Sequence, residues 1–173
     1  MHETMELLRA RLRITNLEES LDFFRNMIGL VEIGRSEAGD GRSALIFLAA
    51  PEEAERARWN DAPLLELAWG RDAADDGAGI ERGHVAYQVE DLYWLCHYLL
   101  HNGITMLRPP RDGRMARVQS PDGHVVELRQ QGNPREAAEP WIFMEDTDPG
   151  ANGWPQGGQS QSVEQPVGWN ITQ

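Results

Sequence analysis

The chain of 173 residues contains a single cysteine, Cys96. An internal disulfide framework and a zinc cluster built only from cysteines are therefore excluded. Long apolar runs are also missing, because the longest, Ala44 to Ala50, has seven residues, whereas a helix needs roughly 20 to span a bilayer. The sequence starts with acidic residues and lacks a basic segment followed by an apolar one. We therefore expect no signal peptide and a cytoplasmic location.

Basic side chains are scarce as well. The sequence has 16 of them against 28 acidic ones, which gives a net charge of −12 and a pI near 4.8. A surface this negative repels phosphate backbones and anionic lipids, so we expect neither nucleic acid nor membrane as a partner. Since 40% of the residues are hydrophobic, the composition suits a soluble globular protein with a small-molecule partner.

The body of the chain, about residues 7–130, shows the same pattern of elements twice. In each repeat, about residues 7–70 and 83–130, a strand leads into a helix of about twelve residues that ends at a glycine, and three further strands follow. Helices are predicted at Leu17–Gly29 and Asp91–Gly103, and strands at Leu7–Thr15, Leu30–Ser36, Ala44–Ala49, Pro63–Trp69, His84–Val89, Ile104–Leu107, Arg114–Ser120 and His124–Arg129.

This order predicts an α+β fold of paired βαβββ repeats that arose by internal duplication. We expect one domain over residues 1–132, followed by a tail over residues 133–173 that is rich in proline and glycine. The tail contains three tryptophans, Trp141, Trp154 and Trp169. Because an exposed indole leaves a large apolar area in water, we expect Trp141 to pack on the body, with Trp154 as the next candidate.

Two glutamates occupy equivalent places in the repeats. Glu66 and Glu127 each lie within an otherwise apolar strand, and His84 opens the first strand of the second repeat. An unpaired buried carboxylate is costly, so each glutamate is expected either to face a cation, a metal or a substrate proton, or to lie on a solvated face of its sheet. If the two sheets face each other, His84, Glu66 and Glu127 form a plausible nitrogen and oxygen ligand set for a divalent metal.

Several motifs of the body occur together in a known family. They are Leu12-Arg13-Ile14, Leu21-Asp22-Phe23-Phe24, Leu65-Glu66-Leu67, Gly83-His84-Val85-Ala86 and Ser120-Pro121-Asp122-Gly123. With these motifs the sequence resembles glyoxalase I, the lactoylglutathione lyases of the vicinal oxygen chelate superfamily, over about residues 7–130. The resemblance implies the paired βαβββ fold and a homodimer whose sites are built across the subunit interface.

The resemblance also implies a divalent metal, Ni²⁺ or Zn²⁺, that is bound by four side chains. Three of them carry over to this sequence as Glu66, His84 and Glu127. The fourth position, normally His or Gln near the start of the first strand, is Arg9. Arginine stays protonated and cannot ligate a metal, so the sequence predicts a weakened metal site.

The activity that the resemblance implies is isomerisation of the hemithioacetal of glutathione and methylglyoxal to lactoylglutathione. Glu127 is the expected base, and Glu66 is the second catalytic carboxylate. Arg13 matches the family arginine that contacts glutathione, Met115 belongs to the loop that covers the substrate, and Arg82 is a further candidate for substrate binding. Two other glutathione positions depart from the family, because Gly70 replaces an asparagine and Ile80 an arginine.

Two alternatives remain at the level of the sequence. In a non-catalytic or metal-free binding protein of the same fold, Arg9 would insert between Glu66 and Glu127 and neutralise both, since arginine–carboxylate pairs are strong. In the other alternative, the protein retains the metal and acts on a different substrate with vicinal oxygens, because a fold does not determine a substrate.

Overall fold

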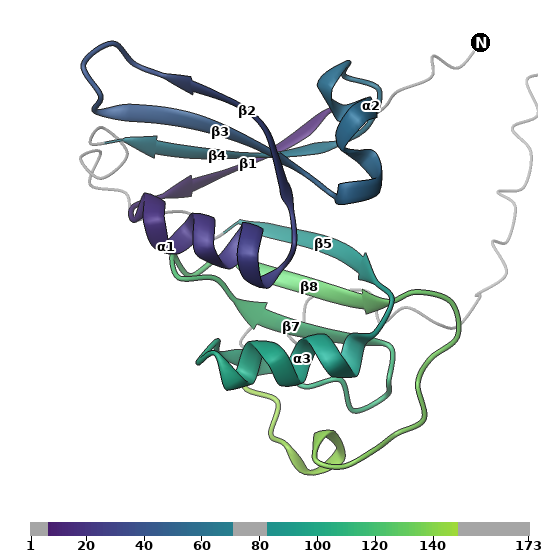
Figure 1. The fold of residues 1–173 in the computed structure, drawn as a ribbon. Coiled ribbons are helices and arrows are strands. Elements are labelled where there is room, and N and C mark those ends of the chain that lie inside the picture. The colour runs from purple at the N-terminus through teal and green to yellow at the C-terminus, as the bar shows by residue number, and fades with distance from the viewer. Residues whose placement is uncertain (1–6, 71–82, 149–173) are drawn as a thin grey trace, which may run out of the picture.

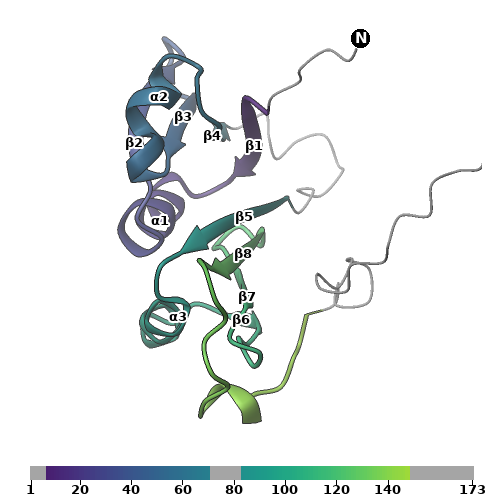
Figure 2. The same ribbon diagram turned by 90° about the vertical axis from the view of Figure 1, so that its right-hand side faces the viewer.

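Two four-stranded sheets form the core of the molecule. The computed structural model describes residues 7–70 and 83–148. The strand order in the first sheet is β1 (Arg9–Ile14), β4 (Leu64–Gly70), β3 (Ser43–Ala49) and β2 (Val31–Glu37). In the second sheet it is β5 (His84–Val89), β8 (Val125–Gln130), β7 (Met115–Gln119) and β6 (Met106–Arg108). The sheets lie one beyond the other, with β1 and β5 as the neighbouring edges (Figures 1 and 2). The paired βαβββ arrangement predicted from the sequence is confirmed.

The two repeats share their topology as well as their element order. In each sheet the first strand along the chain pairs in parallel with the fourth, β1 with β4 and β5 with β8. The other neighbouring strands of each sheet pair in antiparallel. The first repeat consists of β1 (Arg9–Ile14), α1 (Leu17–Leu21) with a π-helical turn (Asp22–Met27), β2 (Val31–Glu37), β3 (Ser43–Ala49), a 3₁₀ turn (Pro51–Glu53) with α2 (Ala54–Arg58), and β4 (Leu64–Gly70). The second consists of β5 (His84–Val89), α3 (Leu92–His101), β6 (Met106–Arg108), β7 (Met115–Gln119) and β8 (Val125–Gln130), and a 3₁₀ turn (Trp141–Phe143) follows it.

Both predicted helices are present, beginning at Leu17 and Leu92, and each ends two residues before its predicted terminal glycine. The side chain of Asn16 accepts a hydrogen bond from the Glu19 amide at 3.2 Å, and Asp91 does the same for Trp94 at 3.0 Å. These bonds satisfy amides that have no partner within the helix. After each helix, Gly29 or Gly103 has a positive φ, a conformation that favours glycine. The last part of the first helix is wound as a π-helix, which the sequence did not predict.

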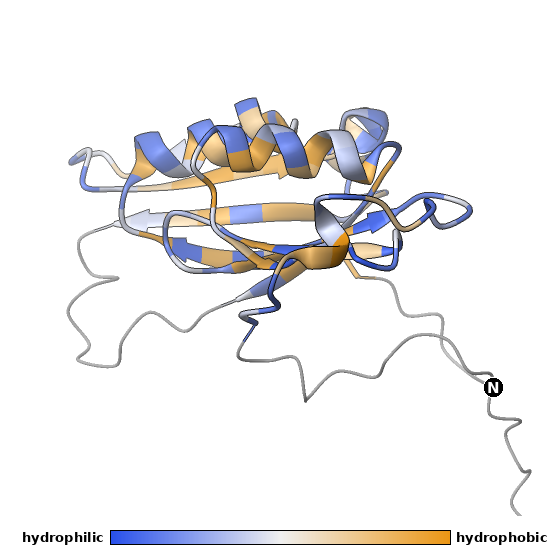
Figure 3. Ribbon diagram, turned by 90° about the horizontal axis from the view of Figure 1, so that it is seen from below, coloured by the Kyte–Doolittle hydropathy of each residue, from blue (hydrophilic) through white to orange (hydrophobic). Residues whose placement is uncertain are grey.

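Helices α1 and α3 cover the same side of the two sheets (Figure 3). On β1, Leu12 and Ile14 alternate with arginines and belong to the buried core. The core continues with apolar side chains of both sheets and both helices, and it includes Cys96 on α3, where burial raises the pKa of the thiol to about 12. The opposite side of each sheet, which we call the open side, carries the candidate site; on the first sheet it also carries Ala49 and Leu64, which belong to an apolar cluster with α2.

One turn joins the two repeats. Asp122, in the tight turn before β8, accepts hydrogen bonds from the amide and hydroxyl of Thr15 at 2.7 Å and from the Ser20 hydroxyl. His124 is wholly buried; its Nδ1 accepts the Gly83 amide at 2.9 Å, and its Nε2 lies 2.6 Å from the Arg13 carbonyl oxygen. These bonds fix the backbone beside Arg13 and beside His84, one from each repeat.

The first part of the predicted tail, residues 133–148, contacts the second repeat. Trp141 is only 1% exposed and lies against Tyr93 and His97 of α3, with ring centroids 6.0 and 4.5 Å away. The prediction that Trp141 packs on the body is confirmed, whereas Trp154 and Trp169 lie outside the described residues. In the described part of the chain, no helix has the length and apolar character needed to cross a membrane.

Candidate functional site

The predicted site residues lie on the open sides of the two sheets, in matching rows. Arg9 is in register with Leu64, two residues before Glu66. His84 is in register with Val125, two residues before Glu127. Residues two apart on a strand point to the same side. Arg9 and His84 therefore occupy equivalent positions in the two repeats.

In the first repeat, two arginines hold one buried carboxylate. Glu66 is wholly buried, although it lies on the open side, because Arg9 and Arg11 from the neighbouring strand cover it. The Arg9 guanidinium donates to Glu66 Oε2 at 3.2 Å, and Arg11 forms an ion pair with Oε1. Oε1 itself accepts no hydrogen bond within the described part of the chain. The carboxylate is thus neutralised on both oxygens by charge.

In the second repeat, Glu127 is also held by two arginines. Arg117 donates to Glu127 Oε2 at 3.0 Å, Arg129 donates to Oε1, and His84 Nε2 lies 3.6 Å from Oε2. Arg117 is almost fully buried and also donates to Asp148, a residue of the C-terminal segment. The result is a chain of alternating charges across the open side of the second sheet.

The charges around Glu127 set the protonation state of this cluster. Burial alone would raise the pKa of Glu127, but hydrogen bonds from Arg129 and Arg117 outweigh it and lower the pKa below the usual value. Burial lowers the pKa of His84, and the negative charge of Glu127 opposes this only in part. At neutral pH the pair is therefore a carboxylate beside a neutral imidazole.

The remaining predicted residues lie one row further along. Arg13 is in register with Ala68 on the first sheet, and Met115 is in register with Arg129 on the second. Each therefore lies two residues beyond its sheet's glutamate row, on the same open side. Arg82, like Ile80, is outside the described residues. Gly70 closes β4, and a Cβ built there would come within 2.9 Å of Ser43 Cβ.

Within one chain, the expectation that Arg9 would neutralise both glutamates holds for Glu66 only. Arg9 pairs with Glu66, whereas Glu127 pairs with Arg117 and Arg129. Within residues 7–70 and 83–148, no three His, Cys, Asp or Glu side chains lie together in a way that could hold a metal ion. The candidate site of this chain therefore consists of two separate half-sites, one on each sheet.

Four residues of these half-sites were not predicted from the sequence. Arg11 and Arg129 alternate with apolar residues on their strands, a pattern that is typical of any solvated strand face. Arg117 carried no signal beyond its place opposite Glu127 in the β7–β8 pair. Asp148 lies in an irregular segment, so no periodicity could relate it to Arg117. The register of the strands reveals Arg11 and Arg117 as partners of the glutamates.

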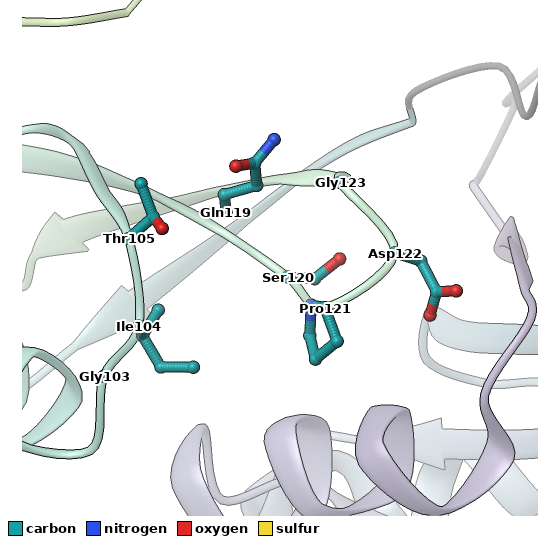
Figure 4. Close-up of a pocket in the computed structure, with 8 residues that line it drawn as sticks. All are labelled: Gly103, Ile104, Thr105, Gln119, Ser120, Pro121, Asp122 and Gly123. Atoms are coloured by element: carbon teal, nitrogen blue, oxygen red, sulfur yellow. The ribbon is translucent and has the colours of Figure 1, made fainter.

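A separate hollow lies between the end of α3 and the turn before β8 (Figure 4). It is lined by backbone and short side chains, among them Thr105, Gln119 and Ser120. Asp122 is its single acidic lining residue, and its carboxylate is already bonded to Thr15 and Ser20. None of the predicted site residues lines this hollow, so it does not extend the candidate site.

Comparison with known proteins places the chain in a family. Residues 6–128 match the Glyoxalase/Bleomycin resistance protein/Dioxygenase superfamily. The chain belongs to this superfamily. It is 33% identical over 132 residues to the lactoylglutathione lyase of Neisseria meningitidis serogroup A, covering 73% of this chain and 91% of that protein. It is 30% identical over 139 residues to a probable lactoylglutathione lyase of Synechocystis, covering 76% of this chain and all of that protein.

A solved structure gives the same result for the fold of this glyoxalase superfamily member. The trypanothione-dependent glyoxalase I of Leishmania major matches with a TM-score of 0.60 and 23% identity, over 74% of this chain and 88% of that one. The expected resemblance to glyoxalase I is thereby confirmed. The relatives named lactoylglutathione lyase support a glyoxalase-like function for this chain.

The donor atoms of the two half-sites do not fit a four-ligand metal centre. His84 and Glu127 suit a divalent cation, because a neutral imidazole nitrogen and a carboxylate oxygen lie 3.6 Å apart. Arg9 contributes a permanent positive charge at the position of the fourth ligand, and Arg11 places a second one on Glu66. Both charges repel a metal ion from the glutamate that it would need.

Proposed function

We propose that this protein is a glyoxalase-type lyase, cytoplasmic in location, that isomerises the hemithioacetal of glutathione and methylglyoxal to lactoylglutathione. The observation that carries the proposal is the pair His84 and Glu127 on the open side of the second sheet, in a chain about 30% identical to named lactoylglutathione lyases. A neutral imidazole beside an ionised carboxylate suits proton transfer at a carbon next to a carbonyl group.

Glu127 is the base in this proposal. It removes the proton from C1 of the hemithioacetal, which leaves an enediolate, and returns a proton at C2 to give the thioester. Arg129 and Arg117 keep the carboxylate ionised and correctly oriented. Arg13 binds a carboxylate of the glutathione part, and Met115 covers the substrate from the same open side. Positive charge on the open sides stabilises the oxygens on which negative charge develops.

The first prediction removes the base. Glu127→Gln keeps the size of the side chain and its contacts with the arginines, but it removes the basic oxygen. Loss of a general base typically lowers the rate by about 100-fold or more, so lactoylglutathione formation, followed by thioester absorbance, should fall by at least that factor. Glu32→Gln, which also loses an arginine-paired glutamate, is the matched control and should stay within about twofold of the wild type. Equal rates in wild type and Glu127→Gln would contradict the role of Glu127.

The second prediction concerns assembly. The two half-sites lie on separate sheets of one chain. In the proposed homodimer, the half-site of Glu66 in one subunit faces the half-site of Glu127 in the other. Light scattering at micromolar concentration should then give about twice the chain mass of 19.5 kDa. An active monomer of that mass would overturn the shared site.

A metal-free binding protein of the same fold is the second candidate function. The observation that favours it is the double arginine cover of Glu66, which removes one carboxylate from metal binding. Such a protein would bind glutathione conjugates without turnover. Calorimetry with S-hexylglutathione, run beside the thioester assay, separates the two functions, because binding without product formation supports the second.

A further inference from the structure

Three arginines follow one another on the open side of β1. Arg9, Arg11 and Arg13 alternate with Ala10, Leu12 and Ile14, which point toward the core. Residues two apart on a strand lie roughly 7 Å apart on the same side, so the arginines form a row along the edge of the first sheet. The side chains of Arg9 and Arg11 are both 58% exposed. This row is strongly cationic in a protein whose net charge is −12.

Glu66 fixes two guanidinium groups of this row side by side. Because Arg9 bonds one oxygen and Arg11 pairs with the other oxygen of the same carboxylate, the two guanidiniums must lie close together. A single negative charge between two positive ones leaves a net charge of +1. The carboxylate is wholly buried and therefore cannot swing away, so it acts as a rigid base for both arginines.

Both guanidiniums retain donors for a ligand. Each guanidinium has five N–H groups; Arg9 donates to Glu66 through Nη1, and Arg11 approaches Glu66 with Nε. The remaining donors belong to groups that are more than half exposed. Phe47, in register with Glu66 on the next strand, adds a half-buried apolar wall, and an apolar neighbour strengthens charge interactions by lowering the local dielectric constant.

We propose that Arg9 and Arg11 form a metal-independent binding site for small anions that carry two neighbouring oxygens, such as a 1,2-dicarboxylate, a 2-oxo acid or an enediolate. Guanidinium groups recognise planar oxygen pairs through two parallel hydrogen bonds. Binding at this site requires neither a metal nor turnover.

Oxalate is the probe, and calorimetry of the full-length protein in buffer with EDTA is the measurement. The wild type should bind oxalate, and Arg11→Gln should weaken binding by at least about tenfold, because one charged bidentate contact is lost. Arg35→Gln is the matched control, since it also removes one arginine that pairs with a glutamate of the first sheet, and its affinity should stay within about twofold of the wild type. Failure of the wild type to bind oxalate, or equal affinity in Arg11→Gln, overturns the site.

Two further arms test how the oxygens are recognised. Arg11→Lys keeps the charge that neutralises Glu66 but loses the planar fork, so it should fold and still bind oxalate at least about tenfold more weakly. Sulfate, a tetrahedral dianion, should bind the wild type more weakly than oxalate does. Equal binding of sulfate and oxalate would mean that the row attracts any anion, which contradicts recognition of an oxygen pair.

The oxalate result is independent of the thioester assay, although both concern the same open sides. Oxalate binding without lactoylglutathione formation removes the proposed reaction and leaves this site. Lactoylglutathione formation without oxalate binding removes this site and leaves the proposed reaction. A requirement for added Ni²⁺ or Zn²⁺ in oxalate binding would overturn the site as well, since the ligand would then be held by the metal.

Discussion

Replacing Arg9 by histidine should raise the affinity for Ni²⁺ or Zn²⁺ by at least about 100-fold. The substitution removes a positive charge that lies 3.2 Å from Glu66 and supplies a neutral nitrogen ligand at the position equivalent to His84. Two unit charges about 4 Å apart interact by roughly 4 kcal/mol at an effective dielectric constant near 20, and each factor of ten in affinity corresponds to about 1.4 kcal/mol. Loss of the repulsion alone is therefore sufficient for the expected gain.

Metal content after dialysis, measured by mass spectrometry, tests this prediction. Arg11 still covers Glu66 in the single variant, so the double variant Arg9→His with Arg11→Met should contain still more metal. Arg35→His is the matched control, because it places a new histidine next to a glutamate away from the site, and its metal content should equal that of the wild type. Equal metal content in wild type and Arg9→His would show that Arg9 does not compete with a metal.

If metal binding is restored in Arg9→His, the thioester assay of the same variant becomes informative. An increase in lactoylglutathione formation would indicate that the arginine limits the reaction of this chain. Unchanged formation with more metal would point to the departures at Gly70 and Ile80, where the family has side chains that contact glutathione. The two measurements thus separate the effect on the metal from the effect on glutathione.

The fold could be predicted because its signals are local and occur twice. Asn16 and Asp91 cap the helices, and glycines with positive φ follow them. These signals mark the helix of each βαβββ unit in the sequence. The π-helical turn at Asp22–Met27 left no such signal. It differs from an α-helix only in which carbonyl each amide contacts, and the same residues suit both.

The sequence predicted the carboxylates, the histidine and Arg9 of the candidate site. Glu66 and Glu127 stand out because charge within an apolar strand is unusual, and His84 stands out because it opens the first strand of the second repeat. Their arginine partners depend on strand register, since Arg11 and Arg117 contact the glutamates from neighbouring strands. Register is a tertiary property, and one alternating strand looks the same whether its polar side faces water or a buried glutamate.

The largest expected effect on stability comes from Trp141. This side chain is 1% exposed and lies against Tyr93 and His97. Trp141→Ala should lower the free energy of unfolding by about 3–5 kcal/mol, because removal of a buried tryptophan loses transfer energy and leaves a cavity. For a chain of this length each kcal/mol corresponds to roughly 2–4 °C in Tm, so Tm should fall by about 6–20 °C in a thermal scan followed by circular dichroism.

Phe143→Ala is the matched control for Trp141→Ala. Phe143 lies in the same 3₁₀ turn but is 73% exposed, so its loss should change the free energy of unfolding by no more than about 0.5 kcal/mol. Truncation after Gly132 should lower Tm at least as much as Trp141→Ala, because it also removes Asp148 from the buried Arg117. The guanidinium then loses one of the two carboxylates that it pairs with and keeps Glu127. If the truncated chain melted at the temperature of the full chain, the C-terminal segment would contribute nothing to the stability of the second sheet, and the contacts of Trp141 would be energetically neutral.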